Sequence, residues 1–295
     1  CSAAAAQPLP KLVFVSDTQQ PIWIETLRLQ EDDNIHASRS IYRSILQESS
    51  AVAVVHLGDI TSIGMFDSYW GPFDEFKRSV RVPVHPALGN HDYFIFHGAA
   101  MQQFRKRFPE RTTSWYAFTV QRVGIIILNS NFSRMSDEEQ DQQQTWYRAQ
   151  LIAFDEDTTV AAVIVACHHS PYTNSSIVEP SRGVQNRFVS LFSMYPKSLL
   201  FLSGHAHTYE HFHLRERDFL VIGGGGGLLQ PLLPERERRF QDLYQAPGER
   251  RFFHYLNCTV SDSSLQLNVM RLRDDHSGVE SADSLLLAFP LRTGR

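Results

Sequence analysis

The sequence predicts a single mixed α/β domain, and two patterns indicate this fold class. In the first half, short apolar runs typical of buried strands alternate with segments of helical periodicity, and in the second half closely spaced strand-like runs dominate. A chain of 295 residues is long enough to bury one large core. No Gly/Ser-rich linker or internal repeat divides it, so we expect a tether at residues 1–10 and one domain at 11–295.

The expected elements begin with a βαβ unit. An apolar run at 11–16 ends in polar residues, 51–57 repeats the pattern, and a periodic segment at 36–49 lies between them. Further strands are expected at 82–88, 115–120, 123–129, 160–167, 198–203, 219–223, 252–260 and 265–272. Further helices are expected at 65–80, 99–108, 137–154 and 184–195. Ser136 and Glu139 form a capping box before the third of these helices.

The composition disfavours two kinds of partner or location. The 28 Lys+Arg and 32 Asp+Glu give a net charge of −4 without a clustered basic segment, so nucleic acid is not expected as a partner. The longest apolar run, 160–167, is much shorter than the roughly 18 residues of a membrane-spanning helix. The three cysteines, Cys1, Cys167 and Cys258, form neither a disulfide framework nor a metal motif.

The sequence starts with Cys1, followed by a segment of small residues at 2–6. This start resembles that of a mature bacterial lipoprotein, in which the first cysteine carries the lipid. A chain cut at an arbitrary cysteine is the alternative. The resemblance predicts a location in the bacterial cell envelope and contact with the membrane only through a lipid on Cys1.

Five polar clusters each follow the C-terminal end of an expected strand, at 16–19, 58–60, 89–92, 168–171 and 204–207. Ligands bind at that edge of an α/β sheet, so we expect the clusters to converge. Together they offer carboxylates, an amide and imidazoles, from Asp17, Asp59, Asn90, His168, His169, His205 and His207. This set is too large for one tetrahedral site and suits two ions such as Mn, Fe or Zn. Two adjacent ions activate water for in-line displacement at phosphorus, which predicts phosphate ester hydrolysis.

The blocks resemble the five ordered motifs of the calcineurin-like metallophosphoesterases. They are Asp17-x-Gln19, Gly58-Asp59, Gly89-Asn90-His91-Asp92, His169-x-Pro171 and Gly204-His205-x-His207. Segments 169–172 and 204–210 are most similar to the purple acid phosphatase branch. The resemblance implies a four-layer αββα sandwich of two mixed sheets flanked by helices. It also implies a hydrolase that uses two divalent or trivalent metal ions on a small-molecule phosphate ester.

The same resemblance implies a role for each motif residue. Asp17, Asp59 and His207 would hold one ion, and Asp59 would bridge to a second ion held by Asn90, His169 and His205. A hydroxide bridging the ions would be the nucleophile. His91 would stabilise the developing charge and protonate the leaving oxygen, with Asp92 orienting it. His169 is preferred over His168 because the family ligand directly precedes an x-Pro pair, and His168 would then be a neighbour of the ligands.

Two positions depart from the family pattern. Gln19 stands where most members have a histidine ligand, and an amide binds metal more weakly than imidazole. Ser62 stands where purple phosphatases have the tyrosine that colours the iron, so this protein should not be purple.

Phosphomonoester hydrolysis is the leading expectation. The alternatives are a phosphodiesterase acting on cyclic nucleotides or glycerophosphodiesters, and a non-catalytic scaffold that only Gln19 supports.

Four further features have simpler interpretations. His211 and His213 alternate with apolar residues, which predicts a strand with one polar face rather than a metal site. The glycines at 223–227 are expected to let backbone pass close to the metal centre. The loop at 20–34, with Trp23, should overhang the site. The segment 230–251 is expected to be a solvated loop whose arginines alternate with glutamates.

Overall fold

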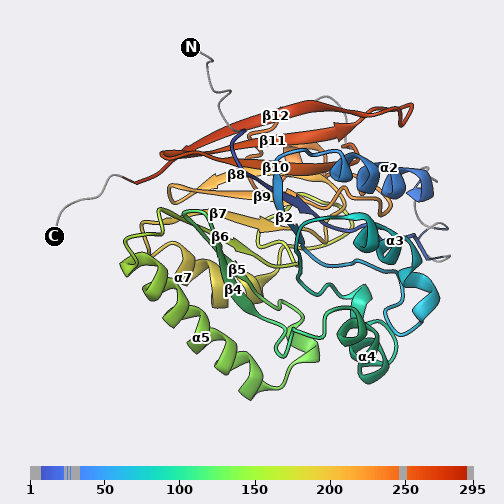
Figure 1. The fold of residues 1–295 in the computed structure, drawn as a ribbon, viewed down its shortest axis with the longest axis horizontal. Coiled ribbons are helices and arrows are strands. Elements are labelled where there is room, and N and C mark those ends of the chain that lie inside the picture. The colour runs from blue at the N-terminus through green and yellow to red at the C-terminus, as the bar shows by residue number, and fades with distance from the viewer. Residues whose placement is uncertain (1–7, 23–24, 26, 28–33, 246–250, 291–295) are drawn as a thin grey trace, which may run out of the picture.

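The computed structural model describes residues 8–22, 25, 27, 34–245 and 251–290. Two six-stranded mixed sheets pack face to face, and helices cover their outer faces (Figure 1). The expected four-layer architecture is therefore confirmed. Cys1 and Trp23 lie outside the described residues, so the expected lipid anchor and the overhanging aromatic stay predictions.

The first sheet has β1 near its centre, with the strand order β12-β11-β10-β1-β2-β3. Its strands are β1 (Lys11–Val15), β2 (Ala51–His56), β3 (Val84–Pro86), β10 (His254–Val260), β11 (Ser264–Leu272) and β12 (Val279–Ala288). β1, β2 and β3 are parallel, whereas β10, β11 and β12 are added as antiparallel neighbours. The three parallel strands therefore end at the same edge.

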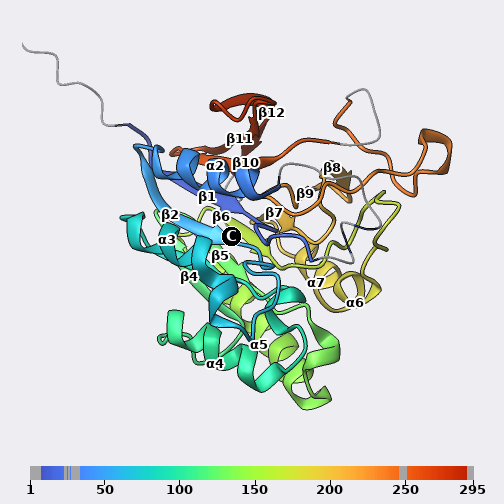
Figure 2. The ribbon, with the colours of Figure 1, turned by 90° about the vertical axis from the view of Figure 1, so that its right-hand side faces the viewer.

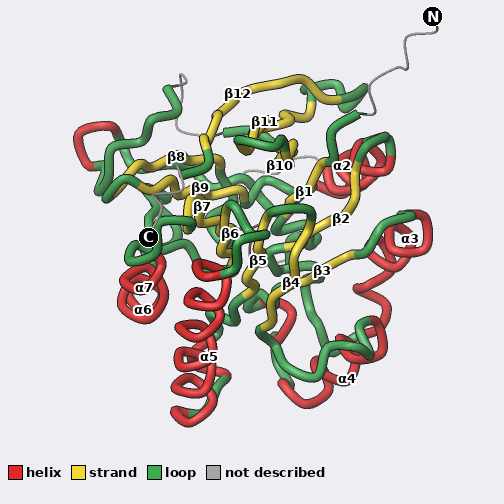
Figure 3. Tube along the Cα trace, turned by 60° about the vertical axis from the view of Figure 1, so that its left-hand side comes forward, coloured by secondary structure: helices red, strands yellow, loops and turns green. Residues whose placement is uncertain are grey.

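The second sheet has the order β4-β5-β6-β7-β9-β8. Its strands are β4 (Tyr116–Val120), β5 (Val123–Ile127), β6 (Ala162–Ala166), β7 (Ser198–Ser203), β8 (Tyr209–Leu214) and β9 (Arg217–Ile222). β5, β6, β7 and β9 are parallel, and the hairpin strands β4 and β8 close the two edges. In the view of Figure 3 the two sheets lie one above the other, with helices outside them.

The central strands are mostly apolar because they are buried on both faces. Leu12 and Phe14 of β1 pack between the two sheets, whereas Val13 and Val15 point to the opposite face and contact helices. α2 (Asn34–Leu46), α3 (Gly71–Ser79) and α4 (His97–Arg107) lie on the side of the first sheet. α5 (Asp137–Glu156), α6 (Arg182–Val184) and α7 (Ser190–Phe192) lie against the second (Figure 2).

The sequence located α5 well and failed to identify one strand. Ser136 caps α5 in the expected capping box with Glu139, and Gln143, Tyr147 and Leu151 form its buried face at helical spacing. β12, an edge strand whose first half is mostly polar and half of whose residues are exposed, was not predicted. The segment expected to be a helix at 65–80 contains instead a short 3-10 turn, η1 (Asp67–Trp70), followed by α3. In the described part of the chain, no helix combines the length and apolarity needed to cross a bilayer.

Candidate metal centre

The predicted clusters meet where the parallel strands of both sheets end. Asp17 follows β1, and Asp59 follows β2, both in a left-handed backbone conformation with φ of +56° and +50°. The backbone N–H of Asp17 donates to Gly58 O at 3.0 Å, and that of Gln19 donates to Asp59 O at 3.2 Å. These bonds join the two loops. The strained conformation turns each chain sharply at the strand end, which is typical of functional sites.

Glycines beside the ligands allow this close approach of loops. A Cβ atom on Gly89 would lie 2.1 Å from Asp59 Oδ1, and one on Gly227 would lie 2.6 Å from Cε1 of His207. The N–H of Gly227 also donates to Asp17 O at 2.7 Å. The expectation that the glycine run passes close to this centre is therefore confirmed.

One group of possible metal ligands consists of Asp17, Asp59 and His207, all buried, with one ligand atom from each within 4.8 Å of the others. His207 Nε2 lies 3.3 Å from Asp17 Oδ1, and its Nδ1 is bound to Leu228 O at 2.8 Å. The backbone carbonyl holds the ring by one nitrogen and leaves the other facing the carboxylates, the usual arrangement of a metal-binding histidine. Burial lowers the pKa of His207, but the hydrogen bond and charge of Asp17 outweigh it and raise the pKa above its usual value.

A second group consists of Asp59, His168 and His205. His168 Nε2 lies 3.3 Å from Asp59 Oδ2 and 3.1 Å from Asn90 Oδ1, while its Nδ1 is bound to Leu57 O at 3.0 Å. Burial and the neighbouring histidines hold the pKa of His205 well below its usual value, so its imidazole is neutral. Asp59 belongs to both groups, which is the arrangement that a bridging carboxylate requires.

This geometry distinguishes His168 from His169, the ligand that the sequence favoured. β6 ends at Ala166, but Cys167 N still bonds to Leu202 O, so side chains continue to alternate. Cys167 packs on the helical side of the sheet, and His168 therefore points the other way, toward Asp59. His169 Nδ1 is instead bound to Ser130 Oγ at 2.9 Å, with its ring 4.5 Å from that of His205. His168 is the residue that joins the ligand group.

Gln19 lies inside the same cluster. Its Nε2 is 3.3 Å from Asp59 Oδ2 and 3.2 Å from His207 Nε2. Its Oε1 is buried and has no hydrogen-bond partner among the described residues. An orphaned buried oxygen beside two carboxylates and three imidazoles suits a cation, so these residues fit the metal centre that the sequence predicts.

His91 lies next to the cluster but belongs to neither ligand group. Its backbone N–H donates to Asp59 Oδ1 at 2.8 Å, and its Nδ1 is bound to Ser62 O at 3.0 Å. Its Nε2 lies 3.6 Å from Glu25 Oε1. The ring is thus fixed by one nitrogen, and the other can hold a proton. Sequence reasoning did not identify Ser62 and Glu25 as partners of His91, because neither belongs to a motif.

Asp92 has a different position from the one expected. Its carboxylate accepts hydrogen bonds from the backbone N–H groups of Ile60, Thr61 and Gly89 at 2.8–3.2 Å, and none of its hydrogen bonds goes to His91. Burial, and then the charge of Asp59, raise its pKa to about 7. Asp92 therefore joins the loops after β2 and β3, and no contact supports the idea that it orients the His91 ring.

Asp59 carries the opposite electrostatic signature. Burial alone would raise its pKa, but His168 and then His91 outweigh burial and lower it below the usual value. Asp59 is therefore an anion shared by the two ligand groups.

His211 and His213 lie outside this centre. As predicted, they belong to a strand, β8, and both are bound to Asp218 Oδ1.

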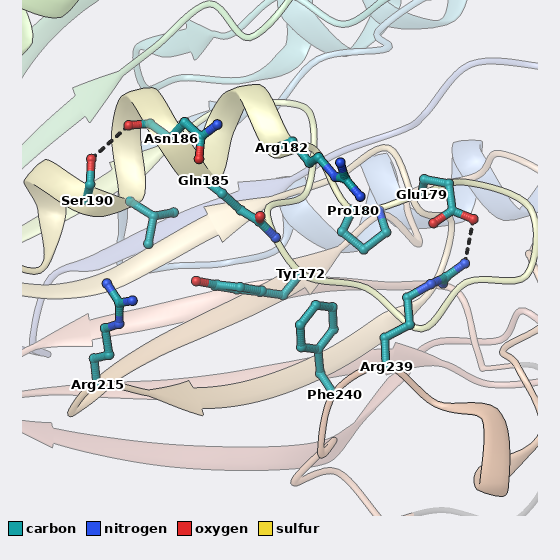
Figure 4. Close-up of a pocket in the computed structure, with 11 residues that line it drawn as sticks. Tyr172, Glu179, Pro180, Arg182, Gln185, Asn186, Ser190, Arg215, Arg239 and Phe240 are labelled. Atoms are coloured by element: carbon teal, nitrogen blue, oxygen red, sulfur yellow. Dashed lines mark hydrogen bonds and ion pairs between the residues drawn. The ribbon is translucent and has the colours of Figure 1, made fainter.

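A cavity of about 1080 Å³ lies apart from the cluster and has none of the ligand candidates in its lining (Figure 4). Tyr172 and Phe240 form an aromatic wall there, and Arg239 from the segment expected to be a solvated loop pairs with Glu179 at 2.6 Å. Size alone therefore does not identify the functional site of this chain.

Comparison with protein families matches residues 10–209 to the calcineurin-like phosphoesterases. A comparison with curated protein sequences gives no significant match. The fold is similar to that of GAP50, described as the anchor in the inner membrane complex of Plasmodium, with a TM-score of 0.72 and 15% identity, covering 96% of this chain and 90% of that one.

Two phosphatases also share the fold. The purple acid phosphatase PPD1 of yellow lupin gives a TM-score of 0.72 at 16% identity, covering 96% of this chain and 54% of that one, so this chain spans about half its length. A dimetal phosphatase from Danio rerio gives 0.57 at 14% identity, covering 96% and 100%. The family match spans most of the chain and contains every ligand candidate described above. The chain belongs to the calcineurin-like phosphoesterase family.

Proposed function

We propose that the protein is a metal-dependent hydrolase of phosphate esters with two metal ions that share Asp59. The observation that carries this proposal is the presence of Asp59 in both ligand groups. Asp17, His207 and Gln19 would hold one ion, and His168, His205 and Asn90 the other. Bound there, the ions would supply Lewis acidity and a nucleophilic water.

The residues of the chain would perform the remaining steps. Hydrolysis forms a bond from the water oxygen to phosphorus and breaks the bond from phosphorus to the alcohol oxygen, which keeps the electron pair. His91 Nε2 would give its proton to that oxygen, because Nδ1 is already bound to Ser62 O. Glu25 Oε1 lies 3.6 Å from Nε2, on the side of the ring that would face the leaving oxygen.

Phosphomonoesters remain the leading substrate class, and phosphodiesters are the second candidate. Asp17 and Asp59 are paired with histidines rather than with lysine or arginine. A monoester carries a second negative charge that free cationic groups would stabilise, whereas a diester does not. The absence, in the part of the chain that the structure describes, of a lysine or arginine paired with Asp17 or Asp59 is therefore compatible with a diester substrate. A scaffold function is the third candidate, and it rests on Gln19 alone.

The test is a comparison of kcat/KM for an aryl phosphate monoester and the matched bis-aryl diester, together with the metal content by native mass spectrometry. We expect two ions per chain and turnover of at least one ester. The preferred ester selects between the two enzyme functions. A chain that binds no metal and hydrolyses neither ester would support the scaffold.

A further inference from the structure

Among the described residues, the exposed aromatic side chains come from two short segments, 64–69 and 94–96, that hydrogen-bond to His91 through Gly64 and Phe94. Among the described residues, the exposed phenylalanines, tyrosines and tryptophans are Phe66, Tyr69, Phe94 and Phe96. Ile95 between the last two is exposed as well. We call these five residues the apolar collar. Large apolar side chains gathered at one exposed place mark a binding surface rather than ordinary surface composition.

Both segments of the collar are attached to one atom of the candidate active site. The carbonyl oxygen of His91 accepts hydrogen bonds from Gly64 N at 3.1 Å and from Phe94 N at 3.0 Å. Phe66 follows Gly64 by two residues, and its ring lies 6.1 Å from that of Tyr69. The ring of Phe94 lies 5.8 Å from the imidazole of His91. Phe94 therefore lies beside the residue that would protonate the leaving oxygen, and the segment of Phe66 is joined to the same residue through Gly64.

The exposed side chain of Ile95 is held on a strained backbone. Ile95 has a left-handed backbone with φ of +73° although it is β-branched, a conformation that costs about 1–2 kcal/mol. Burial of Ile95 does not offset this cost, because the side chain is exposed. Strain in a loop that displays apolar groups beside a reactive histidine is typical of a binding site.

Some of the charged groups next to the collar form ion pairs with one another. Asp67, next to Phe66, pairs with Lys106 and Arg107 at 2.9 Å, and Arg107 also pairs with Asp74 at 2.6 Å. A surface that binds an anionic bilayer combines apolar groups with free cations. Lys106 and Arg107 already form ion pairs, which favours a single apolar ligand over a membrane.

The area of the collar also disfavours a second copy of the chain. Five partly exposed side chains present on the order of 500 Å², below the roughly 800 Å² that each partner buries in a stable dimer. An alkyl chain or a hydrophobic ring is of the right size for this surface.

We propose that the collar receives the apolar alcohol part of the substrate, so that the substrate class is a phosphate ester of a long-chain or otherwise hydrophobic alcohol. This inference rests on the proposed function, because the phosphate would occupy the metal centre while the alcohol lies over Phe66, Phe94 and Phe96. The alcohol oxygen would then be next to His91.

The test measures the affinity of methyl-, butyl- and octylphosphonate by calorimetry, below their micelle concentrations. Their carbon–phosphorus bond is not hydrolysed, so the result does not depend on turnover. We expect octylphosphonate to bind about a hundredfold more tightly than methylphosphonate, because each buried methylene adds up to about fourfold. A double variant, Phe66→Ser with Phe96→Ser, should lose most of this gain.

Met194→Ser is the matched control, because Met194 and Phe96 are both 64% exposed and Met194 lies away from the collar in sequence and fold. It should keep the full dependence of affinity on chain length.

Equal affinity along the series, no binding of octylphosphonate, or the same dependence on chain length in the double variant would overturn the proposal. A flat series accompanied by pelleting with phosphatidylglycerol vesicles, or by a dimer in sedimentation velocity, would assign the collar to a bilayer or a second copy instead. Hydrolysis of aryl phosphates in the same preparation tests the proposed function separately.

Discussion

His168 points its Nε2 atom at the carboxylate of Asp59, 3.3 Å from Oδ2, while the adjacent His169 is bound to Ser130. The two histidines therefore predict different losses. His168→Ala should lower metal affinity by 10- to 100-fold, as the removal of a ligand or its close support does, and should lower turnover with it. His169→Ala keeps the ligand group and should retain most of the bound metal. Metal content after dialysis against a chelator separates the two, and an equal loss in both variants would contradict the assignment.

His91 predicts a loss of rate without a loss of metal. It belongs to neither ligand group, but it is positioned to donate a proton, a contribution of about 10²–10⁴ in rate. His91→Ala should lower kcat by that factor and leave the number of bound ions unchanged. A substrate whose leaving group needs no proton, such as a dinitrophenyl ester, should be affected less. Undiminished hydrolysis of an alkyl ester in this variant would refute the proposed acid.

Asp92 predicts a loss of stability rather than a direct loss of chemistry. Asp92→Ala leaves the N–H groups of Ile60, Thr61 and Gly89 without an acceptor and should lower the free energy of unfolding by about 3 kcal/mol. Asp92→Asn keeps one acceptor oxygen and should cost less. Urea unfolding measures both. If Asp92 instead acted on His91, the Asn variant would keep its stability and lose its turnover.

His85 makes the stability of the fold depend on pH, and it does so away from the metal centre. Burial and then the charge of Arg111 lower its pKa to about 4, so the folded protein holds the ring neutral. Between pH 6.5 and 4 the unfolded chain takes up a proton that the folded chain does not. The contribution of His85 to stability is therefore complete above pH 6.5 and is lost as the pH falls through this window.

His85→Gln tests this contribution and keeps an acceptor for Arg111. The wild type should lose roughly 1–2 kcal/mol more than the variant between pH 6.5 and 4, allowing for partial solvent screening. Parallel stability curves for the two proteins over this range would contradict the assignment.

The parts of the fold that the sequence predicted are those with a local cause. Apolar runs located the buried strands, and the Ser136–Glu139 box placed the start of α5 where the structure has it. The polar clusters after the strands converge because parallel strands end at a common edge. The edge strand β12 was not predicted: its first half is mostly polar, and that half is held in the sheet by its pairing with β11.

The features of the site that the sequence did not reveal have non-local causes. The choice between His168 and His169 depends on how far the alternation of β6 continues, which is fixed by the bond from Cys167 N to Leu202 O. Ser62 contacts His91 through its carbonyl oxygen, so the identity of its side chain gives no signal. The apolar collar was not foreseen, because exposure is a property of the folded chain.

The central claim is that Asp59 serves both ligand groups of a catalytic metal centre. The most direct measurement is aryl phosphate hydrolysis by metal-stripped protein after addition of Mn, Zn, Fe or Mg, for the wild type, Asp59→Asn and the control Asp262→Asn, which changes an exposed turn. We predict metal-dependent turnover in the wild type and the control, and a loss of at least about a hundredfold in Asp59→Asn. Equal turnover in all three proteins, or no turnover with any metal, would contradict it.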